Sequence, residues 1–256
     1  MTQPVETLVV GSRFRGPARS GNGGYAAGAL AGLAHEMTDG AWPATAVRLR
    51  LPPPLDVPMD VVRDGDVVVA TYDGQVVAQA SAGADPVAVA PVPLEVARAA
   101  EETYPGLVTH PFPTCFSCGP GREPGDGLRI FPGLVAELDG RSRVAATWTP
   151  HPSVAEAADD HPEEPGLRTR RPGVWAALDC AGAWAADVGE RPMVLGSMTA
   201  RVDHLPLVGE PHIVVGHDRG RDGRKNFTAT SVYDASGGLV AAAEQVWFTV
   251  DPAAFN

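Results

Sequence analysis

The stretch Pro172–Ala185, PGVWAALDCAGAWA, is small or apolar on almost every side. A helix made from it would have no polar stripe, so the pattern predicts a buried helix rather than an amphipathic surface helix. Pro172 suits the first turn of such a helix, where its missing N–H costs least. A second stretch of this kind, Gly23–Ala34, GGYAAGALAGLA, opens with two glycines. The sequence therefore predicts one buried helix in each half of the chain.

The elements that follow these two helices repeat in the same order, and such a repeat constrains the fold more than a single motif. Each helix is followed by an alternating, strand-like stretch that ends at a proline, Ala46–Pro52 and Thr199–Pro206. Asp-Gly and Gly-Gly turns then favour a hairpin in each half. The paired hairpin strands are Asp66–Gly74 with Gln75–Ala80, and Thr228–Gly238 with Leu239–Phe248.

A helix that is apolar all round must be covered all round, and an antiparallel sheet curled around it provides that cover. We therefore expect an α+β protein with two antiparallel sheets, each wrapped around a central buried helix. The expected parts are a first unit at residues 1–93, a linker at 94–127 that begins with a helix over Leu94–Thr103, and a second unit at 128–256. The acidic, proline-rich insertion at 150–171 is expected to be an exposed loop. Each unit alone would expose an apolar sheet edge, so the two are expected to pair.

The composition excludes several classes of protein. The 256 residues include 20 Lys and Arg against 31 Asp and Glu, a net charge of −11, which argues against a basic surface for nucleic acid. There is no run of about 20 apolar residues, and Met1–Val10 lacks the basic start and apolar core of a secretion signal. Three cysteines are too few for a disulfide framework. We expect a cytoplasmic protein that binds neither nucleic acid nor membranes.

This order of elements resembles that of the tandem hotdog proteins of the thioesterase superfamily, over nearly the whole chain. Gly173–Ala181, GVWAALDCA, is similar to the helix of phenylacetyl-CoA-type hotdog thioesterases, in which two glycines open a buried helix that carries a catalytic Asp. The resemblance implies a double hotdog fold with a pseudo-twofold axis and an acyl-thioesterase activity. It also implies that Asp179 is the catalytic carboxylate.

The chain departs from that family pattern in each half. The family usually has a His before its two glycines, where this chain has Arg171-Pro172. The first half keeps the glycines in Asn22-Gly23-Gly24, but Leu30 and Ala31 stand where the acid would fall. These complementary losses predict a single site, with the glycine turn taken from one half and the acid from the other.

Thioester hydrolysis needs a base or nucleophile beside the carbonyl carbon and donors for the developing oxyanion. Asp179, in an otherwise apolar helix, is the candidate base or nucleophile, with a pKa tuned by burial. Free N–H groups around Gly23 and Gly24 are the candidate donors. Asn22 would cap that helix or bind substrate, and capping is favoured. The alternatives are that Asp179 only caps a neighbouring loop and that the glycines only form a tight turn.

Coenzyme A carries phosphates, so basic residues near the site are candidate contacts. The segment Arg219–Lys225 concentrates positive charge in an acidic chain, and Arg224 and Lys225 are its candidates for phosphate binding. Arg201 and His204, on the strand that follows the second helix, are expected to line the cavity. No cofactor is predicted beyond the coenzyme A of the substrate.

A Cys-x-x-Cys pair, Cys115 and Cys118, raises the question of zinc, because it can supply two thiolates. Two more ligands would be needed, and the conceivable residues show no recognised spacing. They are His110, His151, His161 and Cys180. The sequence alone therefore predicts no metal site, and the pair is interpreted as part of a rigid linker that packs its thiols beneath the second half.

No Gly-x-Ser-x-Gly elbow, phosphate loop or dinucleotide fingerprint occurs, which argues against a serine hydrolase, a nucleotide hydrolase and a Rossmann dehydrogenase. We expect an acyl-CoA hydrolase with one site between the two halves and a small-molecule acyl thioester as its partner. A homodimer is compatible with the pattern. Two alternatives stay open. One is a non-catalytic acyl-ligand binding or pathway accessory protein, and the other is a hotdog enoyl-CoA hydratase or dehydratase, which would need an Asp-His pair.

Overall fold

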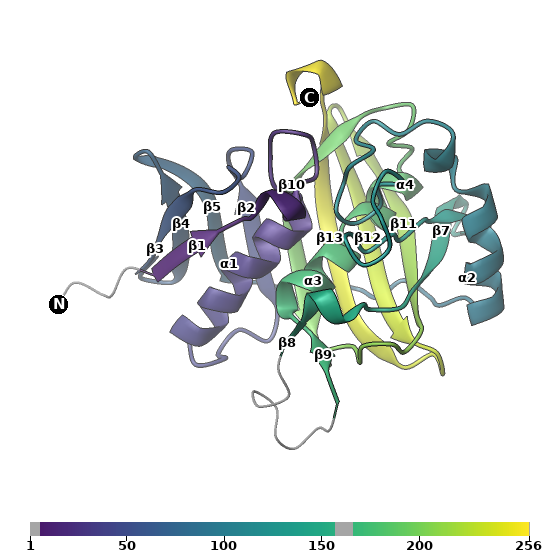
Figure 1. Cartoon of the computed structure of the whole chain (residues 1–256), viewed down its shortest axis with the longest axis horizontal. Helices are drawn as coiled ribbons and strands as arrows, with labels where there is room; N and C mark the ends of the chain where they lie inside the picture. Colours follow the sequence, from purple (N-terminus) through teal and green to yellow (C-terminus); the bar gives the residue numbers. More distant parts are fainter. Residues whose placement is uncertain (1–5, 157–165, 256) are drawn as a thin grey trace.

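The computed structural model describes residues 6–156 and 166–255. Within these ranges eleven strands form one antiparallel sheet, in the order β1-β3-β4-β5-β2-β10-β13-β12-β11-β7-β6 (Figure 1). The strands of the first half are β1 Glu6–Val9, β2 Thr45–Leu49, β3 Pro58–Asp64, β4 Val67–Tyr72 and β5 Gln75–Ala82. Those of the second half are β6 Gly133–Leu138, β7 Arg141–Trp148, β10 Met193–Val202, β11 His212–Asp222, β12 Lys225–Asp234 and β13 Leu239–Thr249.

The two halves meet where β2 pairs with β10, with Thr45 opposite Ala200 and Arg48 opposite Ser197. The prediction of two separate sheets was therefore wrong, because the sheet runs on from one half into the other. The physical reason is that each half has an unpaired strand edge, and joining these edges satisfies the backbone groups of both. Outward from this junction the strand order matches, with β2, β5, β4, β3 on one side and β10, β13, β12, β11 on the other.

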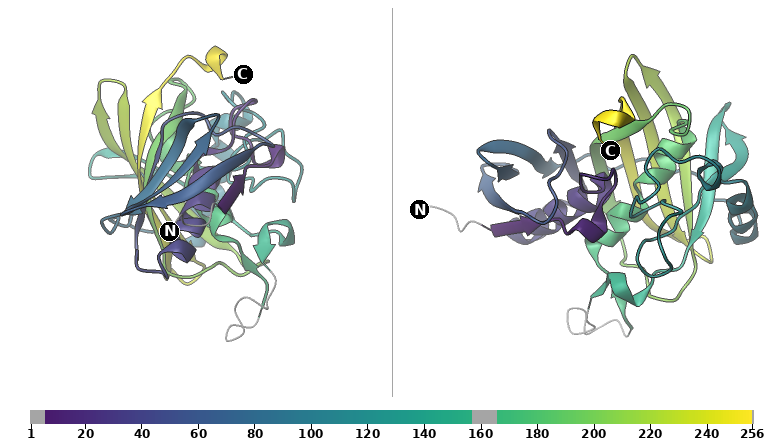
Figure 2. Two further views of the ribbon diagram at one scale, coloured as in Figure 1. Left: turned by 90° about the vertical axis from the view of Figure 1, so that its left-hand side faces the viewer. Right: turned by 45° about the horizontal axis from the view of Figure 1, so that its top comes forward.

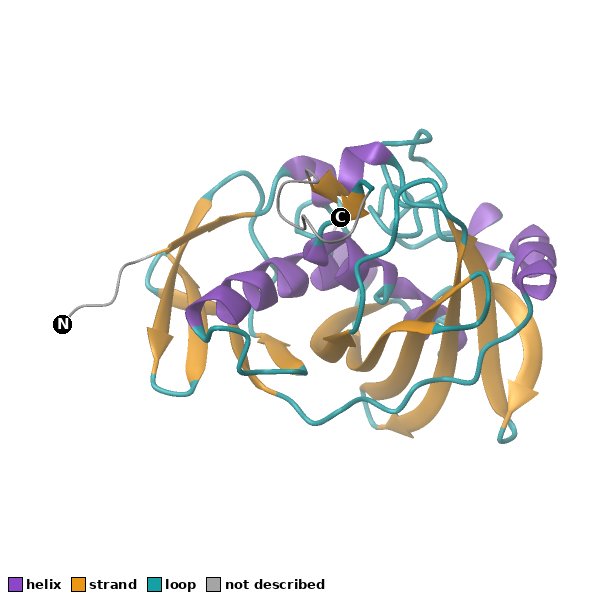
Figure 3. Cartoon of the chain, turned by 90° about the horizontal axis from the view of Figure 1, so that it is seen from below, coloured by secondary structure: helices purple, strands orange, loops and turns teal. Residues whose placement is uncertain are grey.

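Three of the four α-helices lie together on one face of this sheet (Figures 1 and 3). The helices are α1 Gly23–Met37, α2 Leu94–Ala100, α3 Arg171–Ala177 and α4 Cys180–Ala185. α1 packs against α3, while α4 packs against β11 and β7. α2 covers the opposite face of the sheet in the second half. On β11, Val214 belongs to the main core, whereas the next residue, Val215, packs with Ala97 of α2 in a separate apolar cluster. Successive residues of a strand point to opposite faces, so β11 separates the two clusters. Figure 2 shows the same arrangement from two further sides.

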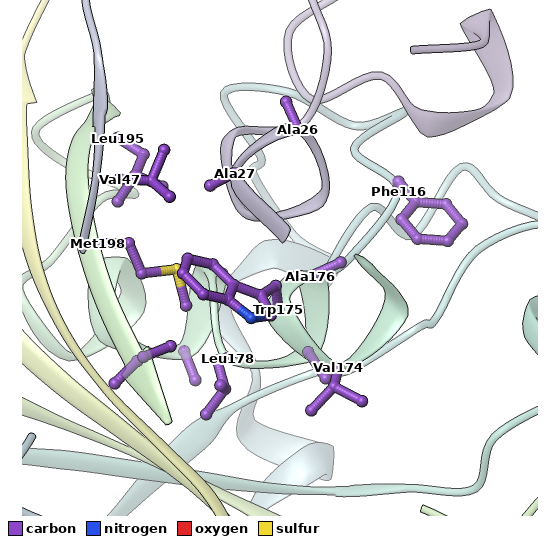
Figure 4. Packing of buried hydrophobic residues seen from close by; sticks show 14 of the residues in the cluster. Ala26, Ala27, Val47, Phe116, Val174, Trp175, Ala176, Leu178, Leu195 and Met198 are labelled. Atoms are coloured by element: carbon purple, nitrogen blue, oxygen red, sulfur yellow. The ribbon is translucent and has the colours of Figure 1, made fainter. Parts of the chain in front are cut away.

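The contact between α1 and α3 depends on one tryptophan and one glycine. Trp175 is 1% exposed and lies among apolar side chains from α1, α3 and β10, including Ala27 and Met198 (Figure 4). A Cβ at Gly28 would lie only 2.5 Å from the Cβ of Trp175. A larger residue at position 28 would therefore push the two helices apart. The small residues that make α1 apolar all round are the ones that let α3 approach it.

The helix predicted over Pro172–Ala185 is broken in the middle. α3 ends at Ala177 and is capped by Leu178, and α4 begins at Cys180, after Asp179, whose φ of −73° and ψ of −80° are not helical. The break is held by a tertiary contact, since Gln245 on β13 donates its side-chain N–H to the carbonyl of Leu178 over 2.7 Å. This bond satisfies a carbonyl that an unbroken helix would have satisfied internally. The prediction of one continuous helix was wrong at the position of the candidate acid.

Several local predictions are confirmed. The helix predicted over Leu94–Thr103 is α2 followed by a 3-10 turn. Asp73 and Gly74, with φ of 48° and 71°, make the turn between β4 and β5, and such left-handed pairs favour Asp-Gly. The insertion at 150–171 was expected to be an exposed loop, but in its described part β8 Ala155–Glu156 pairs with β9 Arg168–Thr169, and Val154 and Thr169 are buried. Residues 157–165 of the insertion lie outside the described ranges. Among the described residues, no helix is both long and apolar enough to cross a membrane.

Candidate functional site

A cavity of about 330 Å³ lies between the start of α1, the linker, the start of α4 and strand β10. Its walls are largely apolar, and the polar groups that reach it are few. Large apolar side chains in the lining are Leu49, Phe112, Trp184, Leu195, Trp247, Phe248 and Phe255. Side chains from positions far apart in the chain meet here, among them Asn22, Cys115 and Asp179. A mostly apolar cavity with a few converging polar groups is the usual form of a small-molecule site.

Asp179 is buried in the wall of this cavity, with 2% of its surface exposed. Its Oδ2 accepts a hydrogen bond from the Asn22 side chain over 2.7 Å. Among the described residues its other oxygen, Oδ1, has no hydrogen-bond partner. Leaving a buried carboxylate oxygen unbonded is costly, so Oδ1 has the capacity to bind a water molecule or another donor that enters the cavity.

Burial raises the pKa of Asp179 to about 7, because desolvation disfavours the charged carboxylate. Negative charge on Cys115 acts in the same direction. The backbone N–H of Gly24, the Asn22 amide and the Cys180 thiol act against the rise, because each favours the charged form. With this pKa, the carboxyl is present in both its protonated and its charged form near neutral pH. A group that takes up a proton and returns it in one reaction needs both forms.

Asn22 both caps α1 and orients the acid. Its Oδ1 accepts from the backbone N–H of Tyr25 over 2.8 Å, and its Nδ2 donates to Asp179 and lies 3.6 Å from the Cys115 sulfur. The capping role favoured from the sequence is thus present. Both polar atoms of the Asn22 amide therefore already have partners within the protein.

Gly23 and Gly24 make room for the close approach of α1 to the second half. A Cβ at Gly24 would lie 2.6 Å from the Asp179 Cβ and 2.6 Å from the Trp175 carbonyl oxygen. A Cβ at Gly23 would lie 2.8 Å from the Leu195 Cβ. As the first two residues of α1 they also have N–H groups without an intrahelical acceptor, and Gly23 lines the cavity. The glycine turn and the acid, 155 positions apart in the sequence, are therefore neighbours.

The predicted basic contacts are not gathered at the site. Arg224 lines the cavity and is exposed, but Lys225 is absent from its described lining. Arg201 forms ion pairs with Asp85 at 3.2 Å and Asp203 at 2.9 Å instead. The expectation that Arg201 and His204 line the cavity was wrong, because neither belongs to the described lining.

A buried polar network behind the helix break was missed at the sequence level. The Thr228 hydroxyl donates to the side-chain oxygen of Gln245 over 2.7 Å and accepts from the Trp247 indole N–H over 3.0 Å. The Gln245 amide also lies 3.0 Å from the Thr230 hydroxyl, in addition to its bond to Leu178. The sequence signal for this network is the polar residues on β12 and β13. Alternation of polar and apolar residues does not show whether such polar residues face the core or the solvent.

The segment that holds Cys115 and Cys118 lines the cavity and brings their thiols to a third. Cys115 and Cys118 are buried, and their sulfurs lie with that of Cys180 so that all three are within 4.8 Å of one another. The interpretation of a linker that packs its thiols beneath the second half is consistent with this position. The sequence did not indicate that Cys180, at the first position of α4, would join them.

Comparisons with known proteins bear on the fold. No family model matches the chain, and no curated protein matches it. Among solved structures, it is similar to a hot dog fold protein of unknown function from Alicyclobacillus acidocaldarius, with a TM-score of 0.60, 14% identity, and coverage of 97% of this chain and 96% of that one. It is also similar to the tesB protein of Mycobacterium avium subspecies paratuberculosis, with a TM-score of 0.55, 14% identity, and coverage of 92% and 89%.

A third similar structure is the acyl-CoA thioesterase II TesB2 of Mycobacterium marinum, with a TM-score of 0.54, 14% identity, and coverage of 91% of each chain. At such low identity the likeness extends to the fold. It confirms the hotdog fold that the sequence resemblance implied. Over nearly its whole length, the chain is a hotdog-fold protein.

Proposed function

We propose that this protein hydrolyses acyl thioesters, with acyl-CoA as the substrate class, in the cavity between its two halves. The observation that carries the proposal is Asp179, a buried carboxyl with one oxygen held by Asn22 and the other unpartnered, in the wall of a largely apolar cavity. In this proposal residues 1–93 and 128–256 are two hotdog units related by a pseudo-twofold axis, joined by residues 94–127. A cytoplasmic location belongs to the same proposal.

Asp179 acts as general base in the proposed reaction. Its Oδ1 accepts a proton from a water molecule while the water oxygen attacks the thioester carbonyl carbon. The tetrahedral oxyanion forms beside the first turn of α1, where the N–H of Gly23 and the positive end of the helix favour negative charge. Collapse of this intermediate breaks the C–S bond, and the departing thiolate takes the proton from Asp179. The products are a carboxylic acid and a thiol.

The shape of the cavity supports an acyl group as its occupant. Trp184, Leu195 and Trp247 provide apolar walls on which an acyl chain gains free energy as it leaves water. Arg224 is exposed and belongs to the same lining, so it is available to the phosphates of a coenzyme A that extends toward solvent. The substrate would thus lie with its thioester between an apolar interior and a basic rim.

A hydratase is less well supported by the same contacts. Hydration of an enoyl thioester needs an acid and a base on the substrate, typically an Asp-His pair. Among the described residues, the groups recorded around the Asp179 carboxyl are an amide, two cysteine sulfurs and a backbone N–H, and none is a histidine. These partners favour a water molecule activated by a single carboxylate.

The test is a panel of acyl-CoAs of different chain length, with release of coenzyme A followed by chromatography because the protein's own thiols would react with thiol reagents. Asp179→Asn and Asp179→Ala are expected to lower kcat by about 100-fold or more, the usual worth of a general base. Asp60→Asn, an exposed carboxyl on β3, is the matched control and should keep full turnover.

Unchanged turnover in Asp179→Ala would remove this residue from the mechanism. Acyl-CoA binding in calorimetry without hydrolysis of any member of the panel would instead identify a binding protein. Water addition to an enoyl-CoA would identify a hydratase.

A further inference from the structure

The three cysteines of the chain form one cluster at the cavity wall. The sulfurs of Cys115 and Cys180 lie 3.6 Å apart, and all three sulfurs, that of Cys118 included, lie within 4.8 Å of one another. They come from two separate segments, the linker and the first turn of α4. Each of the three residues lines the cavity. The general acid-base chemistry proposed for Asp179 gives this cluster no role.

The separations match those of thiolates around a single metal ion. A zinc ion binds sulfur at about 2.3 Å, and tetrahedral geometry then puts two sulfurs about 3.8 Å apart. The 3.6 Å between the sulfurs of Cys115 and Cys180 is already close to that value. The other sulfur–sulfur distances are at most 4.8 Å, so they need to shorten by about 1 Å or less. Small side-chain rotations would therefore complete a three-sulfur site.

The loop that carries two of these sulfurs is fixed by its own hydrogen bonds. The backbone N–H of Phe116 donates to the carbonyl oxygen of Arg15 over 2.8 Å, and the N–H of Gly119 donates back to the Cys115 carbonyl over 2.9 Å. A Cβ at Gly119 would lie 2.5 Å from the Pro113 carbonyl oxygen, so the tight turn after Cys118 needs a glycine. The two thiols are therefore held in place by the backbone before any ion binds, which lowers the ordering cost of binding.

His110 assists this site from outside rather than serving as a fourth ligand. Its Nδ1 accepts a hydrogen bond from the Phe112 N–H over 2.9 Å, so the proton of the neutral ring resides on Nε2. Nε2 lies 3.3 Å from the sulfur of Cys118. An N–H at that distance stabilises a thiolate, as the outer hydrogen-bond partners of metal ligands do. A metal bound at Nε2 would require Nδ1 to be protonated and would break the bond from Phe112.

We propose that Cys115, Cys118 and Cys180 bind one zinc-class ion through three thiolates, with a fourth coordination position that opens into the cavity. Three thiolates at these separations would repel one another unless a cation lay between them, and soft sulfur ligands select soft or borderline metals. The bound ion would tie the linker to α4, next to Asp179, whose Oδ2 lies 3.9 Å from the Cys180 sulfur. The bound ion would hold the start of α4, and with it the break between α3 and α4, in place. This structural role does not depend on a catalytic role for Asp179.

Metal binding by the full-length protein tests the proposal directly. Reduced, chelator-treated wild-type protein is titrated with Zn²⁺ in a calorimeter, and with Co²⁺ by absorption, where sulfur-to-cobalt charge transfer grows with the number of Co–S bonds. We expect one ion per chain and the charge-transfer intensity of three thiolates. Cys115→Ser, Cys118→Ser and Cys180→Ser should each weaken Zn²⁺ binding by about 100-fold or more, beyond the 10–100-fold that loss of an outer partner costs.

His110→Gln separates an outer partner from a ligand. It should weaken Zn²⁺ binding by about tenfold and leave the Co²⁺ charge-transfer band intact. His151→Ala is the matched control, because the His151 ring lies against Gly125 and outside this cavity, and it should not change the affinity.

Reduced wild-type protein that binds no Zn²⁺ at micromolar concentrations would overturn the proposal, as would affinity that the serine variants leave unchanged. Loss of the ion in His110→Gln as complete as in the serine variants would overturn the open fourth position. Protein as purified that is two hydrogens lighter than the reduced chain, and that binds no ion once it has been reduced, would show a disulfide instead. Because the wild-type stoichiometry and the cobalt spectrum need no variant, a serine variant that fails to fold does not prevent the test.

Discussion

Asn22 at the start of α1 donates a hydrogen bond to Asp179 at the start of α4, over 2.7 Å and across 157 positions of sequence. One amide thus caps a helix of the first half and holds the carboxyl of the second. Because the two functions use different atoms of the amide, they can be separated by substitution.

Asn22→Ser keeps a capping oxygen but loses the amide N–H to Asp179, whereas Asn22→Ala loses both. We expect Asn22→Ala to lower the free energy of unfolding by about 2 kcal/mol, from a lost cap and an unpaired buried oxygen. Asn22→Ser should retain the capping part of that stability. If Asp179 is the base, thioester turnover should fall in both, with kcat more affected than KM. Urea unfolding and steady-state kinetics measure the two effects, and full turnover in Asn22→Ser would refute the positioning role.

Gly24→Ala tests the close approach of the two halves. The added methyl group would lie 2.6 Å from both the Asp179 Cβ and the Trp175 carbonyl oxygen, so α1 must move away. We expect a loss of about 1–3 kcal/mol or more, as for other overpacked cores. Gly32→Ala on the same helix is the matched control, since nothing lies within 4 Å of its added Cβ. It should stabilise the protein by up to about 1 kcal/mol through helix propensity alone. Equal effects of the two changes in thermal unfolding would contradict the packing argument.

Gln245→Leu tests the support of the helix break. Without the amide, the Leu178 carbonyl loses its partner at 2.7 Å and the Thr228 hydroxyl loses its acceptor. The cost of unpaired buried groups predicts a loss of about 1–3 kcal/mol. Turnover should fall as well, because Asp179 follows Leu178 directly. Gln75→Leu, an exposed glutamine at the start of β5, should change stability by less than about 0.5 kcal/mol. A Gln245→Leu protein as stable as wild type would show that the break needs no such support.

Arg224→Glu tests the contact with coenzyme A. An exposed ion pair contributes up to about 1 kcal/mol, so reversal of the charge should raise KM for acyl-CoA about fivefold or more and leave kcat unchanged. The effect should weaken at high salt. Lys225→Glu makes the same charge change at a residue outside the described cavity lining and should leave KM nearly unaltered. A thioester of pantetheine, which lacks the phosphates, should not respond to either substitution. Equal responses to both thioesters would exclude phosphate recognition by Arg224.

The sequence predicted the elements better than their junctions. The two buried helices follow from the apolar residues of Gly23–Ala34 and Pro172–Ala185, and the hairpin from Asp73-Gly74, because each signal lies within one element. The break at Asp179 depends on Gln245, 66 positions later, and no local pattern contains that contact. The β2–β10 pairing likewise depends on which edge strand of one half pairs with which edge strand of the other. The alternation of polar and apolar residues along a strand does not contain that information.

The candidate site shows the same division. Asp179 and the glycines were picked out by their resemblance to a hotdog thioesterase helix, and a carboxyl in an apolar stretch and paired glycines at a helix start are both visible locally. The partnership of Cys180 with Cys115 and Cys118 could not be picked out, since Cys118 and Cys180 are 62 positions apart and only the fold brings them together. Arg201 was misplaced for a related reason, because its ion pair with Asp85 is a long-range contact.

The continuous sheet across β2 and β10 has a consequence for how the protein responds to dilution. Two separate subunits joined by such an edge would dissociate as their concentration fell, whereas here the linker keeps the partners permanently at high effective concentration. The described lining of the cavity at this junction therefore comes from one chain, so dilution does not separate the two sides of the site.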